Sequence, residues 1–483
     1  MMSAIDFPLV VDLDGTLTPT DTLVESIIKL IKQSPLNLLR LPFQLMRGRS
    51  EFKSWVASRV GISAEVLPYR ESLLAYLKEE KAKGRRIVLA TAAHRSIADG
   101  VAAHLGLFDH VMASDDGGAN LKGPAKLAAI QKEVGGDFVY AGDSSADIPV
   151  WKGARAAVLV NVSAGVAADV RKSVPVEREI SREKTGLAVW LKALRVHQWM
   201  KNLLLFVPML TAFSFSDPTD IVHILVAFVA FSLTASATYV VNDLWDLESD
   251  RAHPRKSQRP FASARLPIQN GLAVAAVFLV AAFAMALSMS LGLFLILLVY
   301  LVLTSAYSWV LKEYVLMDVI MLSVLYTLRI VAGAIAIEET TSSWLLAFSV
   351  FVFLSLALVK RCAELVTLEQ AGKLTTKGRD YRVTDLVVLW PLGVGAALSA
   401  VVVFGLFISA PETQGRYLSP QLLWFTALGL IYWLSRLWVK TSRGEMHDDP
   451  VVYALKDRGS RLTVIGMVVV MLIARFFPVP GFL

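Results

Sequence analysis

The chain has 483 residues, of which 55% are hydrophobic, and its formal net charge is +7. The apolar residues are concentrated after about residue 186, which excludes a single soluble domain and indicates a soluble part followed by membrane segments. The Lys and Arg excess lies in loops between apolar runs, so we expect a membrane surface and anionic substrates, and no nucleic acid. The single cysteine, Cys362, excludes an intrachain disulfide, and the N-terminus lacks the pattern of a signal peptide.

Short apolar runs followed by polar residues predict parallel strands in the N-terminal part. Phe7–Val11 runs into D-L-D-G-T, where Asp12 and Asp14 have the i, i+2 spacing that sends both side chains to one side of the strand end. This pattern suits a nucleophilic carboxylate beside a second one that acts as acid and base. The later parts follow in order: Arg86–Ala90 ending at Thr91, Lys126 at the start of a helical pattern, and Phe138–Ala141 followed by Asp143 and Asp147.

These motifs resemble those of the haloacid dehalogenase (HAD) phosphohydrolases over about residues 5–162. The resemblance implies a Rossmann-like α/β fold with a helical cap, with Asp12 as nucleophile and Asp14 as general acid/base. It also implies that Thr91 and Lys126 hold the phosphoryl group. Asp12, Asp14 and Asp143 would surround Mg²⁺, with Mn²⁺ as the alternative, while Asp147 orients the loop. A domain that keeps this fold without catalysis is the other interpretation.

A helical insertion between Leu17 and Arg85 is expected to form the cap. Its segment Leu36–Met46 is apolar with basic residues nearby, and two placements are open: on the membrane surface or packed inside the cap. Ala156–Val162 is expected to be the last strand. We therefore expect a phosphatase-like domain at residues 1–165, a linker at 166–186 and a membrane domain at 187–483.

About nine apolar runs of membrane length follow, which predicts an all-α transmembrane bundle. They lie near Asn202–Phe215, Ile221–Val241, Gly271–Met289, Leu291–Trp309, Val315–Ile337, Trp344–Val359, Leu386–Ala410, Leu422–Val439 and Leu462–Phe477. Basic residues occupy every second loop and acidic residues most of the others. By the positive-inside rule, the N-terminal domain and the basic loops are expected to face the cytoplasm. The expected location of the whole protein is a bacterial inner membrane.

An acidic motif follows the second apolar run. Asp243, Asp246 and Asp250 stand at i, i+3 and i+7, so we expect three carboxylates on one face of a helix. Hard oxygen ligands at this density suit Mg²⁺ that bridges to a substrate phosphate. Cations that could bind phosphate oxygens come next in the chain: Arg251, His253, Arg255, Lys256 and Arg259.

The motif N-D-x-x-D-x-x-x-D, which begins at Asn242, resembles the first aspartate-rich motif of the UbiA superfamily of intramembrane prenyltransferases, over about residue 187 to the C-terminus. The following R-x-H-P-x-K is similar to the polyprenyl-phosphate phosphoribosyltransferase branch. Where the aromatic-acceptor enzymes have a second D-x-x-x-D, this chain has Lys360, Arg361 and Glu364. The resemblance therefore implies one pyrophosphate held by metal and a second anion held by cations, although Asp380 and Asp385 leave a second metal ligand open.

Further substrate-binding candidates are Lys201, Tyr307, Lys312 and Arg329. Arg329 lies well inside an apolar run, where a cation must be paired or line a cavity. Asn242 begins the acidic motif beside Asp243, so it is also a candidate for substrate binding. The polar residues of a late loop, Asp449, Lys456, Asp457 and Arg458, have no role that the sequence assigns.

The expected function is transfer of a 5-phosphoribosyl group from phosphoribosyl pyrophosphate to a polyprenyl phosphate, after which the HAD-like domain removes the 5-phosphate. The first alternative is a prenyltransferase that uses a prenyl diphosphate donor and an aromatic acceptor. The second is a non-enzymatic membrane scaffold that binds lipid phosphate. Membrane lipids are expected partners, and a homo-oligomer is left open.

Overall fold

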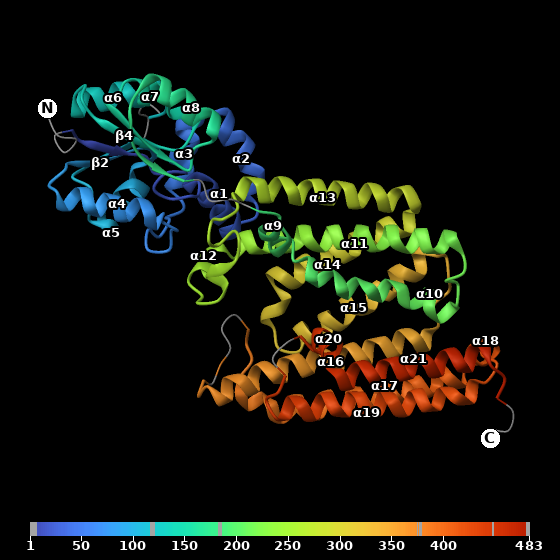
Figure 1. The fold of residues 1–483 in the computed structure, drawn as a ribbon. Coiled ribbons are helices and arrows are strands. Elements are labelled where there is room, and N and C mark those ends of the chain that lie inside the picture. The colour runs from blue at the N-terminus through green and yellow to red at the C-terminus, as the bar shows by residue number, and fades with distance from the viewer. Residues whose placement is uncertain are drawn as a thin grey trace. The chain divides into compact units, whose positions relative to one another are not determined.

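The computed structural model describes residues 7–115, 121–181, 186–373, 375, 379–446 and 449–479. The chain forms two compact units (Figure 1). The N-terminal unit consists of Met1–Arg195 and Tyr239–Ala275, and the C-terminal unit consists of Val196–Thr238 and Ala276–Leu483. The acidic motif therefore belongs to the same unit as the α/β domain, a grouping that the linear order of the chain does not indicate.

The N-terminal unit is built on a parallel sheet of six strands in the order β3-β2-β1-β4-β5-β6. The strands are β1 (Leu9–Val11), β2 (Ile87–His94), β3 (His110–Ser114), β4 (Val139–Gly142), β5 (Ala156–Val160) and β6 (Val176–Ile180). Alternate residues of β1 face opposite sides of the sheet, so Leu9 and Val11 join one hydrophobic core and Val10 joins the other. Helices cover both faces, which confirms the predicted Rossmann-like class.

The helices of this unit are α1 (Thr22–Gln33), α2 (Asn37–Met46), α3 (Arg49–Ala57), α4 (Glu71–Ala82), α5 (Arg95–Leu105), α6 (Pro124–Val134), α7 (Ile148–Lys152), α8 (Ala164–Ser173), α9 (Leu187–Ala193) and α12 (Leu247–Arg251). The first three form the cap in the expected insertion. They enclose a small core of their own, with Leu30, Phe52 and Val56 buried.

The expected linker at 166–186 is wrong in its first part. Residues up to Ser173 form α8, and Val176–Ile180 forms β6, which pairs with β5 in parallel. The segment is polar because β6 is an edge strand with several exposed side chains, so its composition resembles that of a linker. Only the pairing with β5 identifies it as a strand.

The remaining helices are α10 (Val207–Ala212), α11 (Pro218–Trp245), α13 (Ile268–Met289), α14 (Leu291–Trp309), α15 (Met317–Ala336), α16 (Ser343–Gln370), α17 (Leu386–Ser409), α18 (Pro411–Arg416), α19 (Leu423–Ser442), α20 (Pro450–Lys456) and α21 (Arg458–Phe476). In the described part of the chain, eight helices are long and apolar enough to span a membrane. These eight correspond to all of the predicted runs except the first.

The first predicted run, Asn202–Phe215, is not one long helix. A 3-10 helix over Val196–Phe206 is followed by the short α10, which ends at Phe213 with a positive φ of 59°. Pro208 stands in the first turn of α10 and has no N–H to donate, so the α-helical hydrogen bonding starts anew there. Among the residues that the structure describes, eight helices of membrane length therefore stand where nine runs were expected.

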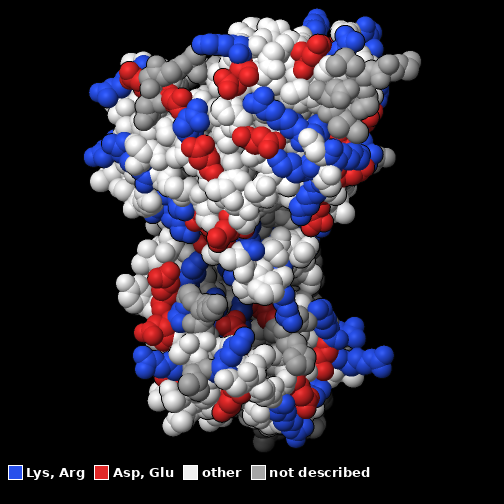
Figure 2. All heavy atoms as spheres, turned by 90° about the vertical axis from the view of Figure 1, so that its left-hand side faces the viewer, with Lys and Arg blue, Asp and Glu red and all other residues white. Residues whose placement is uncertain are grey.

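On the face drawn in Figure 2, Lys and Arg side chains lie among Asp and Glu side chains. The net charge of +7 is therefore not gathered into one basic patch on that face.

Candidate functional sites

The N-terminal unit places a group of carboxylates at the ends of β1 and β4. In an open parallel sheet, ligands bind outside the carboxyl ends of strands where the strand order changes direction. In this sheet β1 lies between β2 and β4, and the strand order changes direction at β1. Asp12 directly follows β1, and Asp143 directly follows β4. The parallel pairing of these two strands brings together side chains that are far apart in the sequence.

Asp12, Asp143 and Asp147 each place one carboxylate oxygen within 4.8 Å of the others. Among the described residues, this is the only group of three or more acidic, His or Cys side chains with such spacing. Burial, together with the charges of Asp147 and Asp12, raises the pKa of Asp143 to about 7. Carboxylates crowded in this way repel each other unless a cation lies among them. The donor set therefore fits a divalent cation such as Mg²⁺ or Mn²⁺.

Asp147 also holds the loop that carries Asp143. It accepts hydrogen bonds from the Tyr140 hydroxyl at 2.8 Å and from the backbone N–H of Ser144 at 3.2 Å. Its predicted role in orienting the loop is thus visible in the structure. Its place among the three close carboxylates was not predicted, because the sequence alone does not show which way the loop turns.

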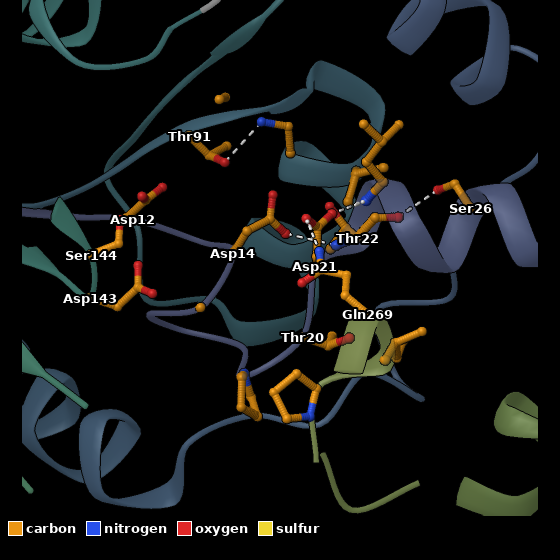
Figure 3. Close-up of a pocket in the computed structure, with 18 of the residues that line it drawn as sticks. Asp12, Asp14, Thr20, Asp21, Thr22, Ser26, Thr91, Asp143, Ser144 and Gln269 are labelled. Atoms are coloured by element: carbon orange, nitrogen blue, oxygen red, sulfur yellow. Dashed lines mark hydrogen bonds between the residues drawn. The ribbon is translucent and has the colours of Figure 1, made fainter. Parts of the chain in front are cut away.

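Lys126 and Thr91 lie beside Asp12, as the resemblance implied. Lys126 opens α6 and is 3% exposed, and its Nζ lies 2.8 Å from Asp12 Oδ2. Thr91 is fully buried in the middle of β2 and accepts a hydrogen bond from the N–H of Ala93. Both line a cavity of about 610 Å³ together with Asp12 (Figure 3). The cavity thus offers two hydrogen-bond donors, the ammonium group of Lys126 and the hydroxyl group of Thr91, next to the carboxylate expected to be the nucleophile.

Asp14 is near this group but outside it. Its carboxylate accepts from the backbone N–H of Thr22 at 2.9 Å, and Figure 3 shows it turned toward Thr22. The metal set of Asp12, Asp14 and Asp143 stays a prediction, while the three carboxylates whose oxygens lie within 4.8 Å of one another are those of Asp12, Asp143 and Asp147. Burial and the nearby Asp21 carboxylate raise the pKa of Asp14 to about 7. A group that carries a proton near neutral pH suits a general acid.

Two cations of this cavity were missed by the sequence reasoning. Lys53 of α3 donates to the carbonyl of Ala92 at 2.8 Å, and burial lowers its pKa. Arg70 donates to the carbonyl of Gly15 at 3.1 Å. Both come from the cap insertion, whose sequence has no motif that would mark them. The only sequence signal that could have indicated these two residues is a positive charge in the insertion that follows D-x-D-G-T.

The acidic motif spans the junction of two helices. Helix α11 ends at Trp245, and Asp246 has φ −94° and ψ 13° before α12 begins. Lys32 donates to the carbonyl of Trp245 at 2.9 Å, and this contact from α1 takes a backbone acceptor at the break. Asp243 lies in α11 and Asp250 in α12, and hydrogen bonds from the N–H of Asp246 to the carbonyl of Asn242 at 3.0 Å and from the N–H of Asp250 to the carbonyl of Asp246 at 2.8 Å continue the helical pattern across the junction.

Asp243 and Asp250 are buried and share one guanidinium. Arg259 Nη1 lies 3.2 Å from Asp243 Oδ1 and 2.5 Å from Asp250 Oδ2. Arg195, which directly precedes the 3-10 helix Val196–Phe206, places Nη2 2.5 Å from Asp243 Oδ1. Asp246 is half-buried, with Lys32 Nζ 3.9 Å from its Oδ1. The motif thus already binds cations, in the form of guanidinium and ammonium groups.

The donors of this motif fit a hard divalent cation. Two buried oxygens, Asn242 Oδ1 and Asp250 Oδ1, have no hydrogen-bond partner. Lys256 Nζ lies 3.8 Å from Asp250 Oδ1, beyond hydrogen-bond distance. A buried oxygen without a donor is costly unless a ligand satisfies it. Carboxylate and amide oxygens are the ligands that Mg²⁺ prefers.

Arg251 and His253, predicted to bind phosphate, make internal contacts in this structure. Arg251 forms a two-pronged ion pair with Glu25 of α1, at 2.6 and 2.8 Å, and both side chains are 6% exposed. His253 is exposed, and its Nδ1 accepts from the N–H of Arg255 at 3.2 Å. Arg251 thus joins the acidic-motif loop to the cap, a contact that no pattern in the sequence indicates.

In the C-terminal unit, Lys201 and Lys360 converge on one carboxylate. Asp449 Oδ2 lies 3.1 Å from Lys360 Nζ and 3.4 Å from Lys201 Nζ. Lys201 comes from the 3-10 helix Val196–Phe206, and Lys360 comes from α16. Asp449, whose role the sequence left open, is therefore the residue that brings these two cations together. His447, in the same loop, lies outside the described residues.

Arg361 is enclosed rather than open to a substrate. It is fully buried, with Nη2 2.6 Å from Asp318 Oδ2, and it also pairs with Glu364. The Tyr381 hydroxyl donates to Asp318 at 2.5 Å. This network ties α15 to α16 and to the loop after α16. The pairing of Asp318 with Arg361 was not predicted from the sequence.

Arg329 lies in the middle of α15 and is 7% exposed. It donates to Asn202 Oδ1 and to the Tyr300 hydroxyl, both at 2.9 Å, and to the carbonyl of Leu325. The expectation that an intramembrane cation must be paired or line a cavity is thus met by hydrogen bonds to neutral groups. Tyr307 and Lys312, the remaining candidates, are half-buried at the end of α14 and in the loop after it.

The other late-loop residues have partners or positions of their own. Asp457 pairs with Arg436 and caps α21 by accepting from the N–H of Ser460 at 2.7 Å. Lys456 and Arg458 on either side of it are exposed. Asp457 is thus part of a helix start, and its geometry gives it a structural role.

Comparisons with known proteins cover both units. The UbiA prenyltransferase family matches residues 203–456, and the haloacid dehalogenase-like hydrolase family matches residues 9–152. The chain is 39% identical over 459 residues to the uncharacterized protein y4nM of Sinorhizobium fredii, covering 94% of this chain and 88% of that protein. This alignment is long enough to include the α/β domain and the membrane helices together.

Two further relatives match more than half of the chain. Nodulation protein NoeC of Azorhizobium caulinodans is 34% identical over 288 residues, covering 59% of this chain and 92% of that protein. Decaprenyl-phosphate phosphoribosyltransferase of Mycobacterium tuberculosis is 32% identical over 284 residues, covering 58% of this chain and 91% of that protein. The chain belongs to the UbiA prenyltransferase family of membrane enzymes and carries an N-terminal haloacid dehalogenase-like domain.

Proposed function

We propose that the membrane part transfers a 5-phosphoribosyl group from phosphoribosyl pyrophosphate to a polyprenyl phosphate. The observation that carries this proposal is the convergence of Lys201 and Lys360 on Asp449. Two ammonium groups held by one carboxylate are placed to exchange it for a phosphate. A relative named decaprenyl-phosphate phosphoribosyltransferase matches over 91% of its length, which supports the choice of donor and acceptor.

In this reaction, an oxygen of the lipid phosphate attacks C1 of the ribose. The bond from C1 to the pyrophosphate oxygen breaks, and the pyrophosphate leaves with the electron pair. Asp243, Asp246 and Asp250 would hold Mg²⁺, which supplies charge stabilisation for the leaving pyrophosphate. Lys201 and Lys360 orient the acceptor phosphate, while the enclosed Arg361 positions α16 through Asp318. Lys256 and Arg259, beside the acidic motif, contribute positive charge near the donor.

We propose a second step in the HAD-like domain, the removal of the 5-phosphate from the lipid product. Asp12 attacks phosphorus and the ester bond to ribose breaks, while Asp14 gives its proton to the departing ribose oxygen. Water then attacks the aspartyl phosphate and returns a proton to Asp14. Asp12, Asp143 and Asp147 would hold the cation that this step requires. Because both active domains are on one chain, the product's local concentration reaches roughly the millimolar range.

The proposed location is a bacterial inner membrane with the α/β domain on the cytoplasmic side. The distribution of basic residues among the loops supports this orientation. Phosphoribosyl pyrophosphate is charged and soluble, so a donor site on the cytoplasmic side would have direct access to it.

The test is mass spectrometry of lipid products after full-length protein is incubated with both substrates and Mg²⁺. Wild type is expected to release polyprenyl phosphoribose without the 5-phosphate. Asp12→Asn should accumulate the 5-phosphorylated lipid, because a carboxamide cannot form the aspartyl phosphate. Asp243→Asn should give at least a several-hundredfold loss of either lipid. Asp169→Asn, an exposed residue of α8, is the matched control and should behave as wild type.

Other outcomes separate the alternatives. Product formed only from a prenyl diphosphate and an aromatic acceptor would replace the proposal with the other UbiA chemistry. Release of the same phosphorylated lipid by wild type and Asp12→Asn would refute the second step alone. Absence of turnover with every donor would favour a lipid-binding scaffold.

A further inference from the structure

Helix α2 presents its apolar side to solvent. Leu36 directly before the helix, and Leu39, Phe43 and Met46 within it, follow an i, i+3, i+7, i+10 spacing and therefore form one stripe. Their exposed fractions are 65%, 68%, 69% and 83%. A helix on the surface of a soluble domain would bury such a stripe. The stripe decides between the two placements that the sequence left open, because it is not packed inside the cap.

The opposite side of α2 attaches it to the cap. Asn37 is buried and donates to the carbonyl of Leu30 at 3.0 Å. Leu41 packs against the small core formed by α1 and α3. The helix is therefore held with its apolar stripe facing outward, and the exposure does not come from a detached segment.

The charges next to the stripe are of one sign. Arg40 and Arg47 follow the stripe on the helix, both are exposed, and residues 36–49 contain no acidic side chain. An amphipathic helix with an apolar face and flanking arginines is typical of segments that lie in the interface of a membrane with anionic lipids. The arginines complement anionic lipid headgroups, and the apolar stripe complements the acyl layer beneath them. A protein surface without an apolar layer would match only the arginines.

The cavity with Asp12 is continuous with these apolar elements. Leu45, on another side of α2, lines the cavity wall. So do Leu266, Pro267 and Ile268, which lead into α13, a helix long and apolar enough to span a membrane. Gln269 of the same helix donates to Asp21 at 3.2 Å and lies beside Thr20 and Asp21 in Figure 3. The cavity therefore has a polar end, at Asp12, and an apolar wall. The wall is formed by α2 and by the start of α13.

We propose that α2 lies on an anionic lipid surface and that the HAD-like cavity takes the phosphomonoester headgroup of a membrane-anchored lipid at that surface. This inference rests in part on the proposed second step, because it names the class of substrate for the same site. The phosphate reaches Asp12 and Lys126 while the lipid tail stays in the membrane beside Leu45 and Ile268. A water-soluble phosphomonoester would bind at Asp12 and Lys126 without any contact between α2 and a membrane.

The first experiment measures the placement of α2 without using the activity. Leu39→Cys is made in a Cys362→Ala background, labelled with an environment-sensitive fluorophore and reconstituted into nanodiscs containing phosphatidylglycerol and doxyl-labelled lipid. Lys132→Cys, an exposed position of α6, is the matched control. We expect strong quenching at position 39 and little at position 132. Equal, weak quenching at both positions would overturn the placement of α2.

The second experiment compares two substrates of the same enzyme. The double variant Leu39→Ser, Phe43→Ser is assayed in nanodiscs with the lipid-linked ribose 5-phosphate that the Asp12→Asn protein accumulates, and with free ribose 5-phosphate. We expect kcat/KM to fall about tenfold or more for the lipid, because two apolar side chains no longer enter the interface. The value for ribose 5-phosphate should stay within about twofold, which also shows that the site is folded.

The two failures are distinguishable. An unchanged ratio of the two kcat/KM values in the double variant would overturn the lipid-substrate inference. Wild-type protein that hydrolyses neither phosphate would refute the proposed second step, and the quenching result alone would then decide whether α2 lies on lipid.

Discussion

The ion pair between Arg251 and Glu25 makes a sharp test of two roles for Arg251. The sequence pattern assigns this arginine to a substrate phosphate, whereas in the structure it binds Glu25 of α1 with two hydrogen bonds at 2.6 and 2.8 Å. Its Nε also donates to the carbonyl of Ala262 at 3.1 Å. We predict that Arg251→Ala acts mainly by destabilising the N-terminal unit.

The magnitude follows from burial. Both side chains are 6% exposed, and removing one partner of a buried pair costs about 3–5 kcal/mol, because the other charge is left without its counterion. Thr20 still donates to Glu25 at 2.5 Å in the variant, so the lower end of that range, about 3 kcal/mol, is the better expectation. At about 2–4 °C per kcal/mol for a unit of this size, Tm should fall by roughly 10 °C.

The assay is thermal unfolding of the full chain in nanodiscs, together with the dependence of transfer on phosphoribosyl pyrophosphate. Glu25→Ala should lower Tm by a similar amount, and the double variant by less than the sum of the two. The exposed pair of Lys29 with Glu248, on the same two helices, is the control, and Glu248→Gln should cost under about 1 kcal/mol. A rise in KM for the donor with Tm unchanged in Arg251→Ala would refute the reasoning and restore the phosphate-binding role.

Three further predictions concern the packing of the rest of the chain. Gly333→Ala should lower Tm, because a Cβ there would lie 2.0 Å from the backbone oxygen of Leu205, whereas Gly395→Ala, with no atom within 4 Å, should be neutral or gain up to about 1 kcal/mol. Tyr381→Phe should cost about 1–3 kcal/mol in chemical unfolding, because it leaves the buried Asp318 without its hydroxyl donor, and a wild-type midpoint would contradict this. The hydrogen bond from Arg436 lowers the pKa of Asp457 below its usual value of 3.8, so the stabilisation from Asp457 is complete above that pH and is lost as pH falls further. The Tm difference between wild type and Asp457→Asn should therefore shrink below about pH 4, and a constant difference would argue against it.

Much of the architecture could be predicted because it is encoded locally. A membrane helix needs only a long apolar run, and a buried parallel strand needs only a short one. The eight described helices of membrane length and the strands before Asp12 and Asp143 therefore follow from composition along the chain, whereas β2 runs past the predicted end at Thr91 to His94. The close placement of Asp12 and Asp143 was implied by the family resemblance, and the parallel pairing of β1 with β4 accounts for it, since parallel strands bring their carboxyl ends to one edge. Edge strand β6 did not follow, because its exposed polar residues read as a linker.

The partners of charged residues were decided only by the tertiary structure. The sequence placed Asp243, Asp246 and Asp250 on one helical face, and the fold adds a lysine from α1 that contacts the carbonyl of Trp245, where α11 ends. The sequence pattern predicted that Arg251 and Arg361 bind anionic substrate groups. In the fold they pair with Glu25 and Asp318, which lie 226 and 43 positions away along the chain. A charge interacts with whatever lies within a few ångströms in space, and local periodicity carries no information about that neighbour.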